Sequence, residues 1–317
     1  VSSIGWSAFT GCKSLKHITI PSTVYWISYS AFDDCKGITS IQWNPYGLDM
    51  ADEEFVDGPF AAICKQITSI TLGDSVTHIP AGLCQNMSKL TSIDIPSSVR
   101  HIDNEAFAGC TSLGHITLPA TLETLGASAF GGCAALNSIR IPEGVTTIME
   151  NTFSGCKGIK QINIPSTVTY IDPTAFIGCK GITSILYNAI EHTDNDNIDF
   201  HDNGNGYSEI FGAEYLPFYH IAGQITSFTI GDQVKYIPFG LCYGMSKLKS
   251  IVIPSSVQSI ANGVFNNCTA LKDITFNSST THLGGLVFHQ TAWYKNQSNG
   301  PLYLNDILYG YKGIAPK

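Results

Sequence analysis

The sequence of 317 residues is poor in charge and contains no long hydrophobic run. Only 13% of its residues are charged, against 44% that are hydrophobic, so the chain is too apolar to be intrinsically disordered. No stretch approaches the roughly 20 apolar residues that a membrane-spanning helix needs. We therefore expect a folded chain that contains no membrane span.

The motifs of common enzyme and metal sites are also missing. The sequence has no Cys-x-x-Cys pair for zinc, no Gly-x-Ser-x-Gly, no His-Glu-x-x-His and no phosphate-binding glycine-rich loop. Its nine histidines are scattered, with no recurrent spacing suited to a metal. Acidic residues could form a glycosidase-like carboxylate pair, but nothing in the sequence fixes their separation. The prediction is a protein that is not an enzyme and has no cofactor.

Positive charge is absent from two segments, and these account for the net charge of −8. Residues 45–59 and 189–217 together hold 12 of the 25 acidic residues and no Lys or Arg. The rest of the chain is weakly basic, at about +4. A weakly basic chain with acidic segments would attract a polyanion such as nucleic acid only weakly. We therefore expect no nucleic-acid partner.

What the sequence does contain is a repeat. A Leu or Ile recurs every 23 residues, apart from steps of 29 and 43 residues, at Leu15, Ile38, Ile67, Leu90, Leu113, Leu136, Ile159, Ile182, Ile225, Leu248 and Leu271. A period in the twenties is typical of a solenoid, whose units bury their apolar faces against one another. Val1 and Ile4 match Val24 and Ile27 one repeat later, so we expect the chain to be a piece of a longer protein. The lack of a signal peptide then says little about its compartment.

Residues 90–112 show the unit in its plainest form. Segment 92–95, Ser-Ile-Asp-Ile, alternates polar and apolar residues and predicts a half-buried strand, which Pro96 ends. Val-x-x-Ile at 99–102 predicts a second extended stretch, and Ala-Phe-x-x-Cys at 106–110 a tight turn or short helix. Stacked in register, the units would form one parallel sheet with strands about 4.8 Å apart.

The pattern Leu-x-x-Ile-x-Ile-Pro-x-x-Val-x-x-Ile-x-x-x-Ala-Phe-x-x-Cys resembles the bacterial BspA-type (Treponema pallidum-type) leucine-rich repeats, over roughly residues 1–290. The resemblance implies a leucine-rich-repeat solenoid of about eleven 23-residue repeats. One face would carry a parallel β-sheet, and the other short extended stretches and short helical turns. It also implies an extracellular or cell-surface location, and attachment to host proteins or to other cells.

The tail departs from the repeat. The run Thr-Ala-Trp-Tyr-Lys-Asn-Gln at 291–297 resembles the closing segment of such proteins, and Phe288 is the last residue at the repeat's Phe position. A β-hairpin turning at Asn305-Asp306 would cover the exposed end of the last coil. The predicted division is a solenoid at 1–290 and a C-terminal capping segment at 291–317.

The ten cysteines follow the repeat as well. Eight of them stand three residues before the repeated Leu or Ile, where other units have Met or Ala, and Cys84 and Cys242 stand where other units have Phe. This interchange indicates small buried hydrophobes. Stacking in register would also hold neighbouring Cβ vectors parallel, which a disulfide does not allow. We predict free, buried thiols.

The two longer steps mark insert loops, at about 45–59 and 189–217. Both leave the repeat at the same point, and Cys35–Ile41 recurs identically as Cys179–Ile185, which indicates a six-repeat internal duplication. The loops would then stand about 29 Å apart along one rim. Loops on rigid scaffolds are where binding usually occurs. The alternative is that these are tolerated insertions whose aromatic residues pack back on the solenoid.

Candidate binding residues lie in the inserts and at their bases: Trp43, Tyr46, Asp52, Glu53, Glu54, Tyr187, Asp194, Asp196, Asp199, Asp202 and Tyr207. Loop 189–217 also offers a calcium pattern, Asp-x-His-x-Asn-Gly-Asn from Asp199. Against it, Glu209 falls one place early and His201 stands where an oxygen ligand is needed. The alternative is a solvated Asp/Asn/Gly loop.

The sequence thus predicts a non-catalytic cell-surface binding scaffold, an adhesin whose partner is a host extracellular-matrix or cell-surface protein. One alternative is a glycan-binding surface protein, served by the hydroxyl and amide side chains that face outward from the sheet. A second alternative is a structural spacer. An adhesin would need the inserts, a glycan binder would need the sheet face or Trp43 and Tyr187, and a spacer would need neither.

Overall fold

The computed structural model describes residues 1–46, 58–192, 199–202, 208–277, 282–304 and 307–312. The chain divides into two compact units, the first formed by residues 1–162 and 170–181, the second by residues 163–169 and 182–317. In each unit the chain winds in coils whose strands pair parallel with those of a neighbouring coil, usually 23 residues away. The predicted solenoid of about eleven turns is confirmed. Within the described ranges, no helix is long and apolar enough to cross a membrane.

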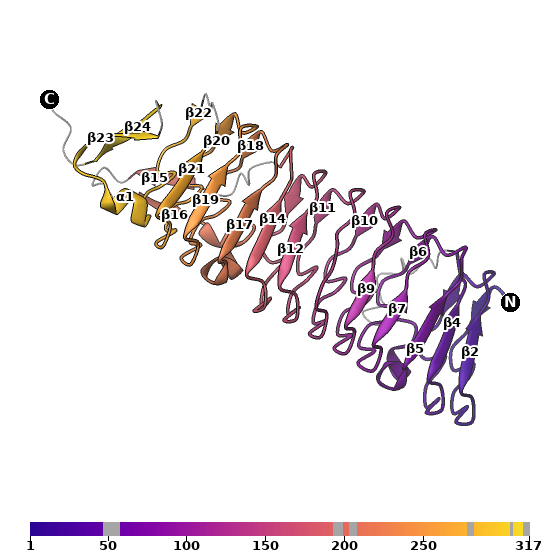
Figure 1. Ribbon diagram of the computed structural model, residues 1–317. Coiled ribbons are helices and arrows are strands. Elements are labelled where there is room, and N and C mark those ends of the chain that lie inside the picture. The colour runs from indigo at the N-terminus through magenta and orange to yellow at the C-terminus, as the bar shows by residue number, and fades with distance from the viewer. Residues whose placement is uncertain (47–57, 193–198, 203–207, 278–281, 305–306, 313–317) are drawn as a thin grey trace. The chain divides into compact units, whose positions relative to one another are not determined.

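One strand of most coils has its alternate residues exposed. Exposed and buried residues alternate along β2, because successive side chains of a strand point to opposite faces. In the first unit these strands are β2 (His17–Ile20), β4 (Ser40–Trp43), β5 (Ser69–Leu72), β7 (Ser92–Asp94) and β9 (His115–Thr117) (Figure 1). In the second unit they are β14 (Ser184–Tyr187), β17 (Ser227–Ile230), β19 (Ser250–Ile253) and β21 (Asp273–Phe276), and β12 (Gln161–Ile164) lies where the two units meet in the sequence.

These strands do not form one continuous sheet. In the first unit β2, β4 and β5 make one ladder and β7 and β9 another, while residues 136–142 of the next coil form no strand. In the second unit β14 pairs with β17 and β19 with β21. The single sheet expected from the repeat is therefore corrected to short ladders. Stacked Phe rings lie within 3° of parallel across three coils, so the core stays in register where the strand ladder is interrupted.

The second extended stretch of the unit forms two-residue strands, as the Val-x-x-Ile pattern predicts. They are β1 (Ser3–Ile4), β3 (Trp26–Ile27), β6 (His78–Ile79), β8 (His101–Ile102), β10 (Thr124–Leu125), β11 (Thr147–Ile148), β13 (Tyr170–Ile171), β18 (Tyr236–Ile237), β20 (Ser259–Ile260) and β22 (His282–Leu283). They pair parallel as β1-β3, β6-β8-β10, β11-β13 and β18-β20-β22.

The Ala-Phe-x-x-Cys segment forms consecutive turns. The Cys110 N–H donates to the Phe107 carbonyl at 3.2 Å, while the Phe107 N–H donates to Ala129 of the next coil at 2.8 Å. Gly109, just before the cysteine, has φ +72°, a left-handed conformation that explains why Gly-Cys recurs in the repeat. Neighbouring coils are thus hydrogen-bonded on their turn side as well as along their strands.

The core is a column of Phe rings flanked by thiols. Phe130 is fully buried, and its ring lies 5.3 Å from Phe107 and 5.9 Å from Phe153. All ten cysteines are free, and nine are buried, which confirms the prediction for those nine. Cys12 is exposed, and there the prediction is wrong, because in the described chain no coil covers the outer side of the first one.

The tail forms the expected hairpin. Helix α1 (Ala292–Asn296) precedes β23 (Gly300–Leu304) and β24 (Ile307–Lys312), which pair antiparallel with Leu304 opposite Ile307. Residues 305–306, where the sequence predicts the turn, lie outside the described residues. Trp293 and Tyr309 pack on the Phe288 ring at 5.5 and 5.6 Å. These contacts close the core of the last coil, and the division at residue 290 stays a prediction.

Candidate binding site

The first insert is anchored in the core at both ends. It leaves after β4, whose last residue, Trp43, is fully buried. It returns at a 3₁₀ helix, Ala61–Gln66. The Trp43 ring lies edge-on to Phe60 at 5.9 Å, and Phe60 lies 5.4 Å from Phe32. The chain thus rejoins the Phe column at Phe60, directly after Pro59.

The second insert has the same kind of anchor. Tyr187, the last residue of β14, is fully buried, and its hydroxyl lies 2.7 Å from Nδ1 of the buried His192. The chain returns through two 3₁₀ helices, Ala213–Tyr215 and Tyr219–Gln224. Phe218 between them is 2% exposed, so Pro217-Phe218 also rejoins the core. Equivalent anchors agree with the internal duplication.

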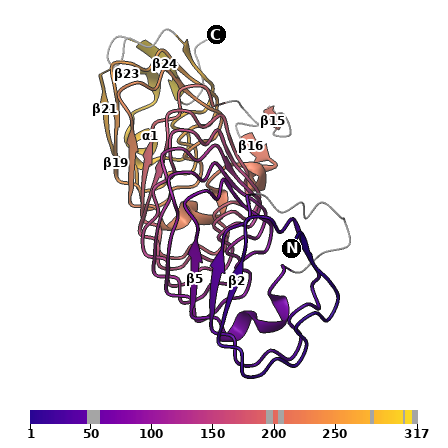
Figure 2. The same ribbon diagram turned by 90° about the vertical axis from the view of Figure 1, so that its right-hand side faces the viewer.

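A short hairpin within the second insert escaped the sequence analysis. Strands β15 (Asp199–Asp202) and β16 (Ser208–Phe211) pair antiparallel. Figure 2 shows this hairpin on the side of the second unit away from β19 and β21. The Asn-Gly-Asn-Gly run at 203–206, between two segments with hydrophobic residues, is a hairpin signal that could have revealed it.

The predicted site residues divide into four groups. Trp43 and Tyr187 lie in the core, so their side chains are not available to a partner at the surface. Tyr46 is 59% exposed, and its carbonyl accepts a hydrogen bond from the Thr77 hydroxyl at 3.1 Å. Asp199 and Asp202 occupy the two ends of β15. Outside the described residues lie Asp52, Glu53, Glu54, Asp194, Asp196 and Tyr207, whose binding role stays a prediction.

No metal site is assembled in the part of the chain that the structure describes. There, no three His, Cys, Asp or Glu side chains are grouped to hold an ion. The calcium pattern that begins at Asp199 continues into residues 203–205, which lie outside the described ranges. Calcium binding in loop 189–217 therefore stays a hypothesis.

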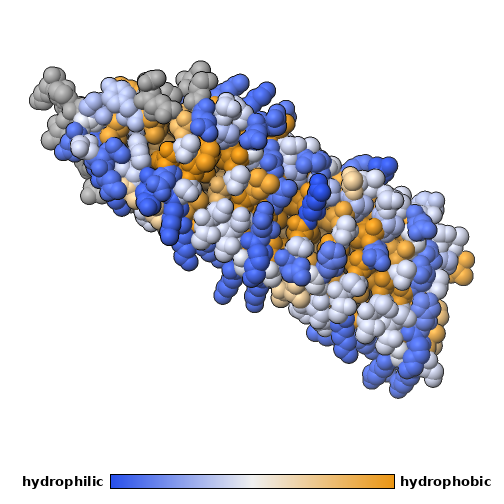
Figure 3. Space-filling model, in the orientation of Figure 1, coloured by the Kyte–Doolittle hydropathy of each residue, from blue (hydrophilic) through white to orange (hydrophobic). Residues whose placement is uncertain are grey.

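The strand-bearing face offers rows of short polar side chains, as predicted. In the first unit His17 Nδ1 lies 2.9 Å from the Ser40 hydroxyl of the next coil, and most residues of these rows are exposed. Figure 3 shows hydrophobic surface between the polar side chains of this face. The face thus combines hydrogen-bonding groups with accessible apolar floor.

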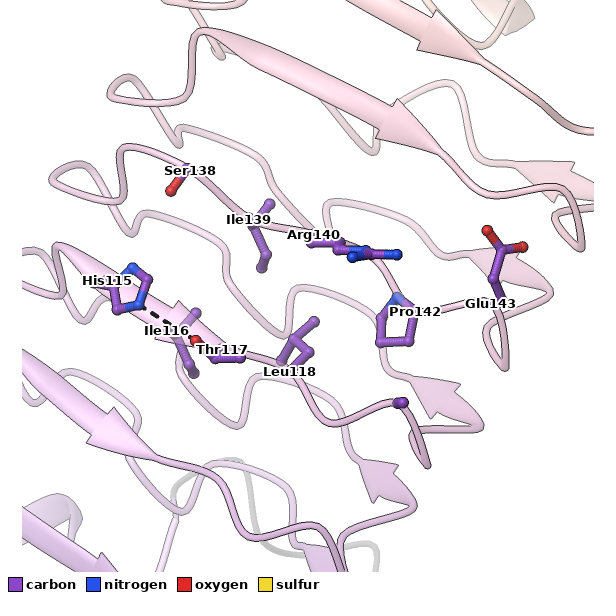
Figure 4. A pocket seen from close by; sticks show the side chains of 10 residues that line it. His115, Ile116, Thr117, Leu118, Ser138, Ile139, Arg140, Pro142 and Glu143 are labelled. Carbon is purple, nitrogen blue, oxygen red and sulfur yellow. Dashed lines mark hydrogen bonds between the residues drawn. The ribbon is translucent and has the colours of Figure 1, made fainter. Parts of the chain in front are cut away.

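Two grooves lie where the strand ladders are interrupted. One, of about 500 Å³, lies between β9 and residues 138–143, and Figure 4 shows its lining. The other, of about 350 Å³, lies between β17 and β19. Sequence reasoning missed both, because Ser-Ile-Arg-Ile at 138–141 alternates as regularly as the segments that do form strands.

The coils, the sheet and the capped end define a parallel β-solenoid of the leucine-rich-repeat class. The family model of the BspA type leucine-rich repeat region matches residues 1–88, 77–203 and 213–297. The chain therefore belongs to the family of proteins with BspA-type leucine-rich repeats. A search of the curated proteins finds no match.

Three solved structures illustrate what the chain resembles. A leucine-rich repeat protein from Bacteroides ovatus is 25% identical, with a TM-score of 0.44, over 92% of this chain and 81% of that one. A leucine-rich cell surface protein from Faecalibacterium prausnitzii is 21% identical, with a TM-score of 0.39, over 84% and 89%. The T. pallidum leucine-rich repeat protein is 19% identical, with a TM-score of 0.33, over 71% and 77%.

Proposed function

We propose that this protein is a non-catalytic binding scaffold at the cell surface or in the extracellular space, and that it acts as an adhesin for a host or cell-surface protein. One observation carries the proposal: each insert is anchored through buried aromatic residues to stacked coils. A rigid frame that holds loops in place is the usual design of a binding protein. Family membership supports the location.

The inserts are the favoured site because of their composition. Residues 45–59 and 189–217 carry 12 acidic residues and no basic one. An acidic surface of this kind would select a partner with a basic patch and speed its association, with an effect that weakens as salt is added. We therefore expect the partner to be a protein with basic surface, in preference to nucleic acid or an acidic polysaccharide.

The test is a paired screen of the intact protein and a double loop variant. In the variant, residues 47–57 and 193–207 are replaced by Gly/Ser segments of equal length, which leaves Trp43, Phe60, Tyr187 and His192 in place. Circular dichroism and thermal unfolding establish that the solenoid is retained. Both proteins are screened against extracellular-matrix proteins and a glycan array, with and without calcium.

Binding to a matrix protein that is lost in the folded variant is the expected result. A glycan signal that survives the replacement would contradict the proposal and move the site to the strand-bearing face, whose hydroxyl groups suit a sugar. Silence on both arrays would favour the structural spacer. Calcium-dependent binding that is lost in the double loop variant, and also in a variant with only residues 193–207 replaced, would support the calcium hypothesis for loop 189–217.

A further inference from the structure

The coil that follows β9 opens away from it on the strand-bearing face. The Asn137 N–H still donates to the Gly114 carbonyl at 3.3 Å, but residues 138–141 then form no strand beside β9. The same two coils are closely stacked on their turn side, where Gly132 N–H donates to Ser154 at 2.6 Å. The opening is therefore local to the strand side, and it forms the 500 Å³ groove.

The walls of this groove are the open edge of β9 and the backbone of residues 138–141. β9 pairs with β7 on one side only, and residues 138–141 pair with no strand among the described residues. Backbone N–H and C=O groups along such edges are the groups that pair with an added strand. An extended peptide presents main-chain donors and acceptors in the same alternation, whereas a sugar does not. The edges therefore favour a peptide.

The residues on the floor and the rim of the groove indicate which side chains a bound peptide would carry. Ile116, Leu118 and Ile139 are 3%, 8% and 7% exposed and form an apolar floor. On the rim, His115 Nε2 lies 3.3 Å from the Thr117 hydroxyl. Figure 4 shows the Arg140 side chain extending along the groove toward Pro142. Apolar residues alternating with polar ones would match this surface.

Arg140 supplies the charge that selects the ligand. The sequence has two arginines, and Arg100 is paired with Glu123 at 2.8 Å. Arg140 is exposed and makes no hydrogen bond or ion pair with the residues that the structure describes. A guanidinium binds a carboxylate through two parallel hydrogen bonds. Glu143, also on the rim, disfavours a second acid beside the first.

We propose that this groove binds an extended peptide segment of a partner protein, with its main chain paired to the open strand edge and one Asp or Glu side chain held by Arg140. The site is separate from the inserts. It adds a peptide specificity to the proposed function and can be tested without the natural partner.

The probe is a fluorescein-labelled peptide, Val-Thr-Val-Glu-Val, with capped ends, and binding is followed by fluorescence anisotropy. A Gln version removes the charge, and a version methylated at alternate backbone nitrogens removes main-chain donors. The protein variants are Arg140→Gln and, as the matched control, Arg100→Gln. We expect the Glu peptide to bind about tenfold more tightly than the Gln peptide, a preference that is lost in Arg140→Gln and kept in Arg100→Gln.

A second readout uses arginine chemistry. In the Arg100→Gln variant Arg140 is the sole arginine, so phenylglyoxal modification reports on it alone. The Glu peptide should slow this modification, and the methylated peptide should not. A Glu preference that survives Arg140→Gln, equal binding of the methylated peptide, or equal protection by a uronic-acid oligosaccharide would each overturn the proposal. Peptide binding that persists in the double loop variant separates this site from the inserts.

Discussion

At the scale of single residues, the buried cysteines show how one coil holds the next. The Cys133 thiol donates to the Phe107 carbonyl at 3.2 Å, and the Cys156 thiol to the Phe130 carbonyl at 3.1 Å. Each bond joins residues 26 positions apart, from one coil to its neighbour. A thiol is small enough for this place and, unlike Ala, satisfies a buried carbonyl.

Thiol reagents should therefore modify only one cysteine in the native protein. Cys12 is exposed and the other nine cysteines are buried. With iodoacetamide at pH 8, mass spectrometry should find a single modification at Cys12 in the native protein and ten modifications after unfolding in urea. Rapid native labelling of Cys133 or Cys156 would show that the coils do not stack as described.

Alkaline pH should destabilise the fold through the same thiols. Burial raises the pKa of Cys133 and Cys268 to about 12 and that of Cys179 to about 11. In the unfolded chain these groups ionise near pH 8.5. Because the native state keeps its protons, the stabilisation is complete below about pH 8.5 and is lost as pH rises toward 11 or 12.

The measurement is the free energy of unfolding in urea between pH 8 and 10.5. Above pH 9 its slope should approach about −1.4 kcal/mol per pH unit for each buried thiol that ionises on unfolding. The matched variant Cys133→Ala removes one such thiol. Its slope should therefore be less steep than that of the intact protein by about 1.4 kcal/mol per pH unit. A stability that is flat across this range would refute the assignment of the thiols to the core.

The Phe column should contribute strongly to the stability of the fold, because its rings are fully buried. Phe130 is fully buried between Phe107 and Phe153, so Phe130→Ala leaves a cavity and should cost about 3–5 kcal/mol in urea unfolding. The control Thr111→Ala, at an exposed position, should change stability by less than about 0.5 kcal/mol. Similar values for the two variants would contradict the stacked column.

At the scale of elements, the C-terminal hairpin closes the solenoid through one tyrosine. The Tyr309 hydroxyl accepts a hydrogen bond from the Phe288 N–H at 2.9 Å, and burial raises the pKa of this tyrosine well above its usual value. The hairpin thereby satisfies a backbone donor of the last coil that no further coil reaches. Its role is to seal the core against water.

Removing that acceptor should loosen the capped end. Tyr309→Phe leaves the Phe288 N–H without its partner and should cost about 1–3 kcal/mol. Hydrogen exchange of the Phe288 amide should speed up accordingly. Tyr303→Phe, at a 57% exposed position, is the control and should leave this exchange unchanged. Equal exchange in both variants would contradict the sealing role.

The elements also show how far the sequence could predict the fold. Strand, turn and Phe positions follow from the 23-residue period, because each is set by alternation or by recurrence within the unit. The interrupted ladders could not be foreseen, because the pattern at 138–141 alternates as regularly as in the segments that do form strands. For the candidate site, the insert positions were predictable. The burial of Trp43 and Tyr187 was predictable too, because each stands 23 residues after a buried Ile, Ile20 or Ile164, at an inward-facing strand position.

At the scale of the whole molecule, the stacked coils form a scaffold that carries the insert loops. Each unit has its own stacked core and its own anchored insert, and the inserts interrupt neither core. In repeat proteins such stability comes from nearest-neighbour contacts, so surface can change without loss of the fold. The proposed adhesin function uses this separation of core from surface.

The central claim is that the anchored inserts bind the host or cell-surface protein. Its most direct test is the equilibrium affinity of the intact protein and of the double loop variant for immobilised extracellular-matrix proteins, measured by surface plasmon resonance at two salt concentrations. We expect the folded variant to bind at least about tenfold more weakly, and higher salt to weaken binding by the intact protein more than binding by the variant. Equal affinity of the two proteins at both salt concentrations would contradict it.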